Sequence, residues 1–182
     1  IDLSSGSVLA LAAVIAASFG QTADWAAKMY PNIPELPVII PVLTALLVGA
    51  LCGTINGTFI AKTGIPPFIA TLGMMVSARG LALLYSDGRP VSSLTDSYKW
   101  FGQGYVLEMG SFKGIPVPVI IYIIMIVITW VMLTQTRFGK NIYAIGGNVH
   151  AAEVSGINVK KNLIAIYAYA GLLAGLELVT YS

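Results

Sequence analysis

Charged residues are scarce in this sequence. Only ten Lys or Arg and eight Asp or Glu occur among 182 residues, about 10% of the chain, whereas a soluble domain carries roughly 25%. The charges also avoid three long stretches, at 3–23, 36–61 and 114–136. Because about 20 apolar residues in a helix cross the ~30 Å hydrocarbon layer, these stretches predict membrane spans. The scarcity excludes a soluble globular enzyme, a disordered chain and a nucleic-acid-binding protein.

Cysteine and histidine occur once each, as Cys52 and His150. A single cysteine excludes an internal disulfide, and a single histidine excludes a metal site built from several His and Cys ligands. The phosphate-binding pattern G-x-x-x-x-G-K-[ST] is absent, and a Ser-His-Asp triad would have to recruit His150 from a basic connection. We therefore predict no catalytic residues, no metal site and no cofactor bound by this chain.

Hydropathy predicts an all-α membrane protein, a polytopic transmembrane helix bundle of about five spans. In lipid the backbone must satisfy its own hydrogen bonds, so each span is expected to be a helix, whereas a barrel would show short alternating segments. The apolar segment 3–23 could mimic a signal peptide, but it has no basic leader and further spans follow it. We interpret 1–182 as a fragment of one transmembrane domain, with spans at about 3–23, 38–61, 65–85, 115–135 and 163–182.

The orientation follows from the Lys and Arg residues in the connections. The segment 136–162 has four basic residues and one acidic residue, a net charge of +3, whereas 86–113 has three of each sign and 24–35 has a net charge of −1. The positive-inside rule then predicts that 136–162 is a cytoplasmic loop. The segments 86–113 and 24–35 are expected to be outer loops.

Small and polar residues within the expected spans suggest how the helices pack. Four-residue spacing places small residues on one helix face, where another helix can approach closely, so we interpret five glycines as packing residues. Polar residues in a span usually face a cavity or a partner helix, so Asn56 and Thr71 are expected either to line a path for a polar solute or to form interhelical hydrogen bonds. Arg79 can extend its charged end to the interface. The packing glycines are Gly49, Gly53, Gly57, Gly171 and Gly175.

A short capped helix is predicted inside the basic segment 136–162. Asn148 is a favourable N-cap, 149–155 can form two helical turns, and Gly156 suits the left-handed position just past a helix end. A generic basic loop is the simpler alternative. A short helix of about 10 Å projecting into the cytoplasm would suit a membrane subunit that fits into a groove on a soluble motor protein.

Several blocks of sequence, in order along the chain, together carry a family resemblance. They are Ile1-Asp2-Leu3-Ser4 with Gly6, Gly53-Thr-Ile-Asn56-Gly57, Ile65-Pro-Pro-Phe-Ile-Ala-Thr71-Leu-Gly73 with Arg79-Gly80, Thr136-Arg137-Phe138-Gly139, Ala144-Ile-Gly-Gly-Asn148, and Ala151-Ala152-Glu153-Val-Ser-Gly156-Ile-Asn-Val159. In these blocks the chain resembles the membrane permease subunit of bacterial ABC importers for monosaccharides, of the ribose, galactose/methyl-galactoside and xylose type. The resemblance covers essentially the whole chain.

The resemblance implies a set of partners and a location. Such permeases have about ten helices, so the chain would lack an N-terminal part and several C-terminal helices. Two permease copies pair in the bacterial cytoplasmic (inner) membrane, each on an ATP-binding subunit that uses ATP and Mg²⁺, and a periplasmic sugar-binding protein delivers the sugar. No nucleic acid is expected.

The resemblance also implies roles for individual residues. Asp2 and Ser4 belong to a motif where a helix is commonly interrupted, and we expect them near the substrate path with Asn56 and Thr71. The family's coupling helix, which contacts the ATPase, matches the residues Asn148, His150, Ala151, Ala152, Glu153 and Gly156.

Two departures from the family pattern qualify these roles. His150 stands where the family often has Glu, and Glu177 stands where the family favours small apolar residues.

Two other classes of protein remain as alternatives: a secondary transporter driven by H⁺ or Na⁺, and a non-transporting membrane scaffold subunit. A secondary transporter usually holds ionisable residues deep in the membrane, and here only Arg79 and Glu177 qualify.

Overall fold

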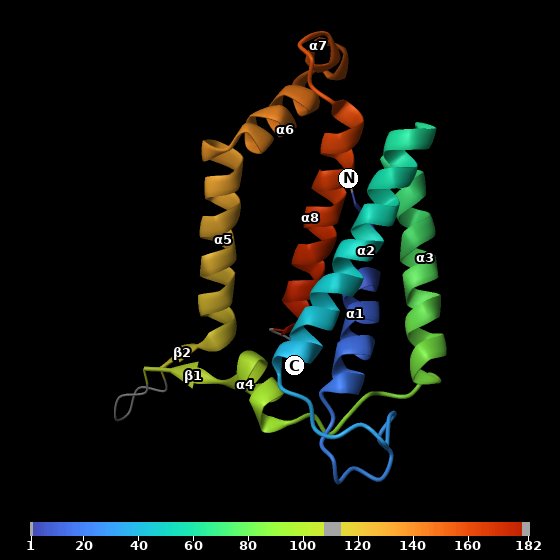
Figure 1. Ribbon diagram of the computed structural model, residues 1–182, viewed down its shortest axis with the longest axis vertical. Coiled ribbons are helices and arrows are strands. Elements are labelled where there is room, and N and C mark those ends of the chain that lie inside the picture. Colours follow the sequence, from blue (N-terminus) through green and yellow to red (C-terminus); the bar gives the residue numbers. More distant parts are fainter. Residues whose placement is uncertain (1, 108–113, 180–182) are drawn as a thin grey trace.

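The computed structural model describes residues 2–107 and 114–179, and helices dominate it (Figure 1). The structure confirms the all-α membrane fold class. The long helices are α1 (Ser5–Phe19), α2 (Ile39–Thr63), α3 (Pro67–Ser86), α5 (Val117–Gln135) and α8 (Val159–Val179). The shorter elements are α4 (Asp96–Gln103), β1 (Tyr105–Val106), β2 (Ile115–Pro116), α6 (Arg137–Gly147) and α7 (Val149–Val154).

One long helix lies in each of the five expected spans. By length and composition, α2, α3 and α5 are each able to cross a membrane. The apolar helix α1 has only 15 residues, about 22 Å of rise, which is less than the ~30 Å hydrocarbon layer. Figure 1 shows α1 starting below the upper ends of α2 and α3, at a level inside the bundle. Residues 180–182 of the fifth expected span lie outside the described residues.

Four of the long helices form the bundle. The most extensive contact joins α2 to α8, and α1 packs against α2, α3 and α8. The side chains buried between them include Val8, Leu11, Cys52, Ala78 and Ala174. Helix α5 stands apart from this bundle in Figure 1 and is joined to it mainly through its ends.

Glycines set the close approach of α2 and α8. A Cβ atom at Gly53 would overlap the backbone carbonyl oxygen of Tyr167, and one at Gly57 would lie 2.8 Å from the Ile164 Cα. Cβ atoms at Gly49 and Gly171 would each overlap the other residue's carbonyl oxygen. Backbones at this separation gain contact along their whole length, which is the main attraction between helices in lipid. The fifth glycine, Gly175, faces the Ala45 carbonyl in the same contact.

Both long connections contain more regular structure than expected. The expected outer loop 86–113 contains α4 and β1, and β1 pairs antiparallel with β2 in register Tyr105↔Pro116. The expected cytoplasmic loop 136–162 contains α6 as well as the short helix α7. Residues 108–113 of the outer loop lie outside the described residues.

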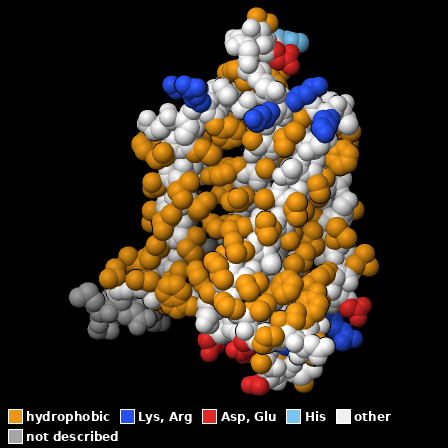
Figure 2. Space-filling model, viewed as in Figure 1, with side chains coloured by type: hydrophobic (Ala, Val, Ile, Leu, Met, Phe, Trp, Pro, Cys, Tyr) orange, Lys and Arg blue, Asp and Glu red, His pale blue; other side chains and the backbone are white. Residues whose placement is uncertain are grey.

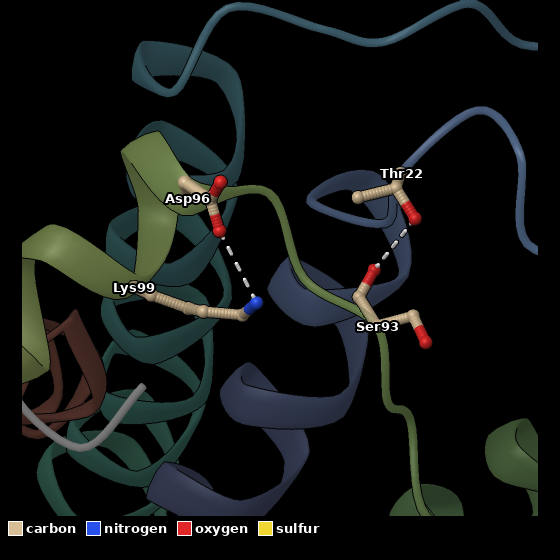
Figure 3. A network of polar contacts seen from close by, with 4 residues as sticks. All are labelled: Thr22, Ser93, Asp96 and Lys99. Atoms are coloured by element: carbon tan, nitrogen blue, oxygen red, sulfur yellow. Dashed lines mark hydrogen bonds and ion pairs between the residues drawn. The ribbon is translucent and has the colours of Figure 1, made fainter.

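The two connections that are expected to lie outside the membrane are hydrogen-bonded to each other. The Thr22 N–H donates to the Ser93 carbonyl at 2.9 Å, and the Thr95 N–H donates to the Gly20 carbonyl at 2.8 Å. The Thr22 hydroxyl donates to the same Ser93 carbonyl at 3.3 Å, close to the exposed Lys99–Asp96 ion pair of α4 (Figure 3). These bonds hold the connection after α1 against the connection after α3.

Candidate translocation and coupling sites

A hydrogen-bonded polar cluster marks the beginning of α1. The Asp2 carboxylate accepts hydrogen bonds from the Ser4 N–H at 2.8 Å and from the Ser4 hydroxyl at 2.6 Å. The Ser4 hydroxyl oxygen in turn accepts from the Asn56 side-chain amide at 3.0 Å. Ser4 and Asn56 are buried, at 1% and 2% exposure. The structure therefore brings together three of the four residues predicted near the substrate path.

The fourth residue, Thr71, is fully buried in the first turns of α3. Its hydroxyl donates to the Phe68 carbonyl of its own helix at 3.3 Å. Within residues 2–107 and 114–179, no hydrogen bond joins Thr71 to Asp2, Ser4 or Asn56.

Sequence reasoning did not single out Tyr167 of α8, which packs against α2 beside the cluster. This tyrosine is 7% exposed, and its backbone faces Gly53, which lies three residues from Asn56 on α2. The i, i+4 relation of Tyr167 to Gly171 was the available signal, since it places both residues on the helix face that contacts α2.

The cluster provides a hydrogen-bond acceptor for a backbone N–H group at the start of helix α1. The first N–H groups of a helix have no partner within the helix, and such groups are costly at membrane depth. The Asp2 carboxylate takes up the Ser4 N–H, and neutral hydroxyl and amide groups surround it. Groups of this kind suit a polar, uncharged solute, because they exchange hydrogen bonds with hydroxyls without the desolvation cost of a full charge.

The segment that follows α5 forms the second candidate site. Thr136 caps α6 by accepting from the Gly139 N–H at 3.2 Å, and Asn148 caps α7 by accepting from the Ala151 N–H at 3.0 Å. Gly156 has φ of +82°, the left-handed conformation that ends the turn after α7. In Figure 1, α7 forms the tip of the molecule, beyond the ends of the long helices.

The other predicted coupling residues divide into one buried and several exposed positions. Ala152 is buried at 3% exposure with Ile145 of α6 and Val159 of α8, whereas Ala151 is exposed. The exposed His150 imidazole lies 3.9 Å from the Glu153 carboxylate. Ala152 therefore joins α7 to α6 and α8, and a partner can contact His150, Ala151 and Glu153.

Charge separates along the molecule. On the face in Figure 2, most Lys and Arg side chains gather near α6 and α7, and most acidic side chains lie at the opposite end. At that opposite end, burial raises the pKa of the Tyr98 phenol of α4 to about 12.

The two charged residues that the sequence placed within the spans, Arg79 of α3 and Glu177 of α8, are both exposed on the described surface. No group of three or more His, Cys, Asp or Glu side chains suited to a metal occurs among the described residues.

Comparison with known proteins shows similarity to transport permeases, both for the matching family and for individual relatives. The family described as "Branched-chain amino acid transport system / permease component" matches residues 1–179. The chain is 42% identical over 174 residues to the galactose/methyl galactoside import permease protein MglC of Escherichia coli, covering 94% of this chain and 51% of that protein. It is 41% identical over 180 residues to the Escherichia coli ribose import permease protein RbsC, covering 97% of this chain and 50% of that protein.

A third relative is similar to this chain over nearly the same range. The ribose import permease protein RbsC of Bacillus subtilis is 40% identical over 178 residues, covering 97% of this chain and 50% of that protein. The chain thus spans about half the length of the curated relatives it matches. No solved structure matches it. These relatives confirm the resemblance to sugar-importer permeases that the sequence blocks carry.

Proposed function

This chain belongs to the branched-chain amino acid transport system / permease component family, and from that premise we propose that it forms part of the permease of an ATP-driven monosaccharide importer. The observation that carries the proposal is the identity of 40–42% to galactose and ribose import permeases over nearly the whole chain. The family's own description refers to branched-chain amino acids. The relatives and the neutral polar side chains of Ser4 and Asn56 favour a sugar.

The proposal includes a set of partners. Two permease copies pair in the bacterial inner membrane, separate ATP-binding subunits that use ATP and Mg²⁺ contact α7 on the cytoplasmic side, and a periplasmic sugar-binding protein delivers the substrate to the outer connections. The absence of a phosphate-binding loop from this sequence supports assigning ATP hydrolysis to another subunit. In this assignment the chain provides the path and is not itself an enzyme.

A continuous series of contacts supports a mechanical coupling from α7 to the path. Ala152 of α7 packs with Ile145 and Val159, so a displacement of α7 acts on the first turn of α8. Helix α8 is held against α2 along the glycine contact, and α2 carries Asn56, which bonds to Ser4 at the start of α1. Movement of α7 by the ATPase would therefore shift the polar cluster as a unit, opening the path on one side at a time.

Replacing Ala151-Ala152-Glu153 with an unrelated helical segment tests the coupling. We expect sugar uptake and sugar-stimulated ATP hydrolysis to be lost, while the permease still inserts into the membrane. Exposed Val154, at 91% exposure, offers a control, since Val154→Ala keeps both the cap and the Ala152 contact. Uptake that survives the segment exchange would contradict the assignment of α7.

Copurification tests the importer class itself. We expect the permease, extracted in mild detergent, to bring down an ATP-binding subunit, and the Ala151–Glu153 exchange to release that subunit. Sugar uptake that follows a proton or sodium gradient with no ATP-binding subunit would replace the importer with a secondary transporter. The sugar is then identified by measuring which monosaccharide stabilises the cognate binding protein.

A further inference from the structure

The connection between α1 and α2, residues 20–38, is mostly irregular in backbone and yet is held in place at many points. An irregular segment longer than about 12–15 residues usually serves a function in a compact domain. In Figure 1 this connection extends beyond the ends of the long helices, at the end opposite α7. Helices of a bundle pack along their sides, so a segment beyond their ends is available to a partner outside the membrane.

Gln21 joins this connection to the connection that follows α3. Its side chain is 2% exposed. The Nε2 group donates to the Ser92 carbonyl at 3.0 Å, and Oε1 accepts from the Met29 N–H at 2.9 Å. The backbone of Gln21 pairs with Leu94 in an isolated antiparallel bridge. One buried amide side chain therefore links two segments that lie 71 residues apart in the sequence.

The junction between the two connections also holds Ser93 in a conformation that favours glycine. Ser93 has φ of +59°, in the left-handed region. Its carbonyl accepts from both the N–H and the hydroxyl of Thr22 (Figure 3), and the Thr95 N–H donates to the Gly20 carbonyl on the other side of the bridge. A conformation of this kind persists only where the surrounding structure determines it. The junction is therefore rigid.

Further bonds fix the exposed part of the connection after α1. Lys28, 9% exposed, donates from Nζ to the Ile33 carbonyl at 2.7 Å, and the Tyr30 hydroxyl meets the Tyr85 hydroxyl of α3 at 2.8 Å. The Lys28 N–H closes a turn onto the carbonyl of Trp25, whose side chain is 41% exposed. Exposed tryptophans dominate many protein–protein interfaces, and one on a fixed backbone loses little entropy on binding.

We propose that Gln21 is a positioning residue that holds the two connections together as one docking platform for the sugar-binding protein, with Trp25 as a contact residue. The proposal rests on the proposed function, which supplies the partner. Gln21 is buried and acts through the backbone at Met29 and Ser92, which carries the exposed parts of the platform. The two connections stay joined throughout the transport cycle, so that docking does not have to order a loop.

Gln21→Leu tests the positioning role, since leucine has nearly the same size and no hydrogen-bonding group. The full-length permease is assembled with its ATP-binding subunit in lipid nanodiscs and titrated with its sugar-loaded binding protein. We expect the concentration for half-maximal stimulation of ATP hydrolysis to rise about tenfold, because docking must then order the connections. The basal and maximal rates should stay unchanged. Trp25→Ala should raise the same concentration by removing a contact.

Thr22→Val is the matched control for Gln21→Leu. It removes a hydroxyl bond of 3.3 Å to a carbonyl that keeps its bond from the Thr22 N–H, so the half-maximal concentration should not change. A lower maximal rate in Gln21→Leu, at an unchanged half-maximal concentration, would overturn the proposal. Gln21 would then act on the transport movement and not on docking.

A disulfide in place of the Gln21 bonds tests whether joining the connections is what matters. Residues directly opposite each other in an antiparallel pair have Cα atoms about 4.5–5.5 Å apart, within the range that a disulfide bridges. Gln21→Cys with Leu94→Cys, in a Cys52→Ala background, should dock weakly when reduced and recover the wild-type half-maximal concentration when oxidised. An oxidised form that docks no better than the reduced form, or that loses sugar uptake, would overturn the proposal. This comparison is made within one variant, so it decides the question even where Gln21→Leu does not fold.

Limited proteolysis separates this proposal from the proposed function. In detergent and without a partner, chymotrypsin should cleave Gln21→Leu within residues 20–38 faster than the wild type, and the oxidised double-cysteine variant no faster than the wild type. Equal cleavage of Gln21→Leu and Thr22→Val would overturn the positioning role. A wild-type permease that its sugar-binding protein does not stimulate would instead contradict the proposed function and remove the docking partner, and proteolysis would still decide whether Gln21 fixes the connections.

Discussion

At the scale of single residues, the polar cluster has a fixed hydrogen-bond direction. A carboxylate only accepts, so the Ser4 hydroxyl must donate to Asp2 and is left to accept from the Asn56 amide. Both Ser4 and Asn56 are buried, so the loss of either partner leaves a polar group unsatisfied at membrane depth. The sequence indicates that each residue is polar in apolar surroundings. It does not indicate that residues 52 positions apart meet, because that contact depends on how α1 packs against α2.

We expect Asn56→Ala to destabilise the bundle by about 1–3 kcal/mol, because the Ser4 hydroxyl loses its buried donor. Thr54, two residues earlier, is exposed and donates only to the Ala50 carbonyl of its own helix. Thr54→Ala is therefore the matched control and should change stability by less than about 0.5 kcal/mol. Thermal unfolding in detergent measures both variants. Equal effects would mean that the Ser4–Asn56 bond does not contribute to stability.

Burial of Tyr98 predicts a dependence of stability on alkaline pH. Its pKa is raised from 10.0 to about 12 in the folded protein, so the folded state favours the neutral phenol. The associated stability is fully present below pH 10.0 and is lost as the pH rises through about 12, a change of roughly 3 kcal/mol at most. Tyr98→Phe should remove this loss. Unfolding curves at neutral pH and between these two values compare the variants, and an unchanged slope in Tyr98→Phe would contradict the prediction.

At the scale of elements, long apolar helices were predictable and short interfacial elements were not. Long, mainly apolar segments identify α2, α3 and α5, because lipid leaves the backbone no alternative to a helix. The elements α6, β1 and β2 contain mixed or very short sequences, so their structure depends on contacts with the ends of the spans. Helix α7 was predictable despite its six residues, since Asn148 and Gly156 mark its two ends chemically.

The α2–α8 contact predicts that replacing one of its glycines with alanine destabilises the bundle. Gly53→Ala would place a methyl group into the Tyr167 carbonyl, and such overpacking typically costs about 1–3 kcal/mol. Gly80 of α3 has no atom within 4 Å of an added Cβ, so Gly80→Ala should be neutral or slightly stabilising because alanine favours a helix. Thermal unfolding distinguishes them. A loss of stability in Gly80→Ala equal to that in Gly53→Ala would point to a general effect of losing glycine.

At the scale of the whole molecule, charge placement predicts the orientation in the membrane. The bundle is closely packed at the α2–α8 contact and open at α5, so packing alone does not tell which end faces the cytoplasm. The end that carries α6 and α7 is basic (Figure 2), and the opposite end carries α4 and the hydrogen-bonded connections that follow α1 and α3. The sequence already contained this asymmetry in its connection charges, because the positive-inside rule depends on local counts of Lys and Arg and not on tertiary contacts.

Accessibility of single cysteines tests this orientation. In a Cys52→Ala background, a cysteine at Asp96, the first residue of α4, should react with a membrane-impermeant thiol reagent in intact cells whose outer membrane admits it. A cysteine at Glu153 of α7, 54% exposed, should react only after the inner membrane is opened, because α7 lies at the basic end. Both side chains are accessible on the described surface, so a difference in labelling reports the side of the membrane and not burial. Labelling of position 153 in intact cells would contradict the predicted orientation. It would mean that α7 lies outside the inner membrane, where a cytoplasmic ATPase cannot reach it.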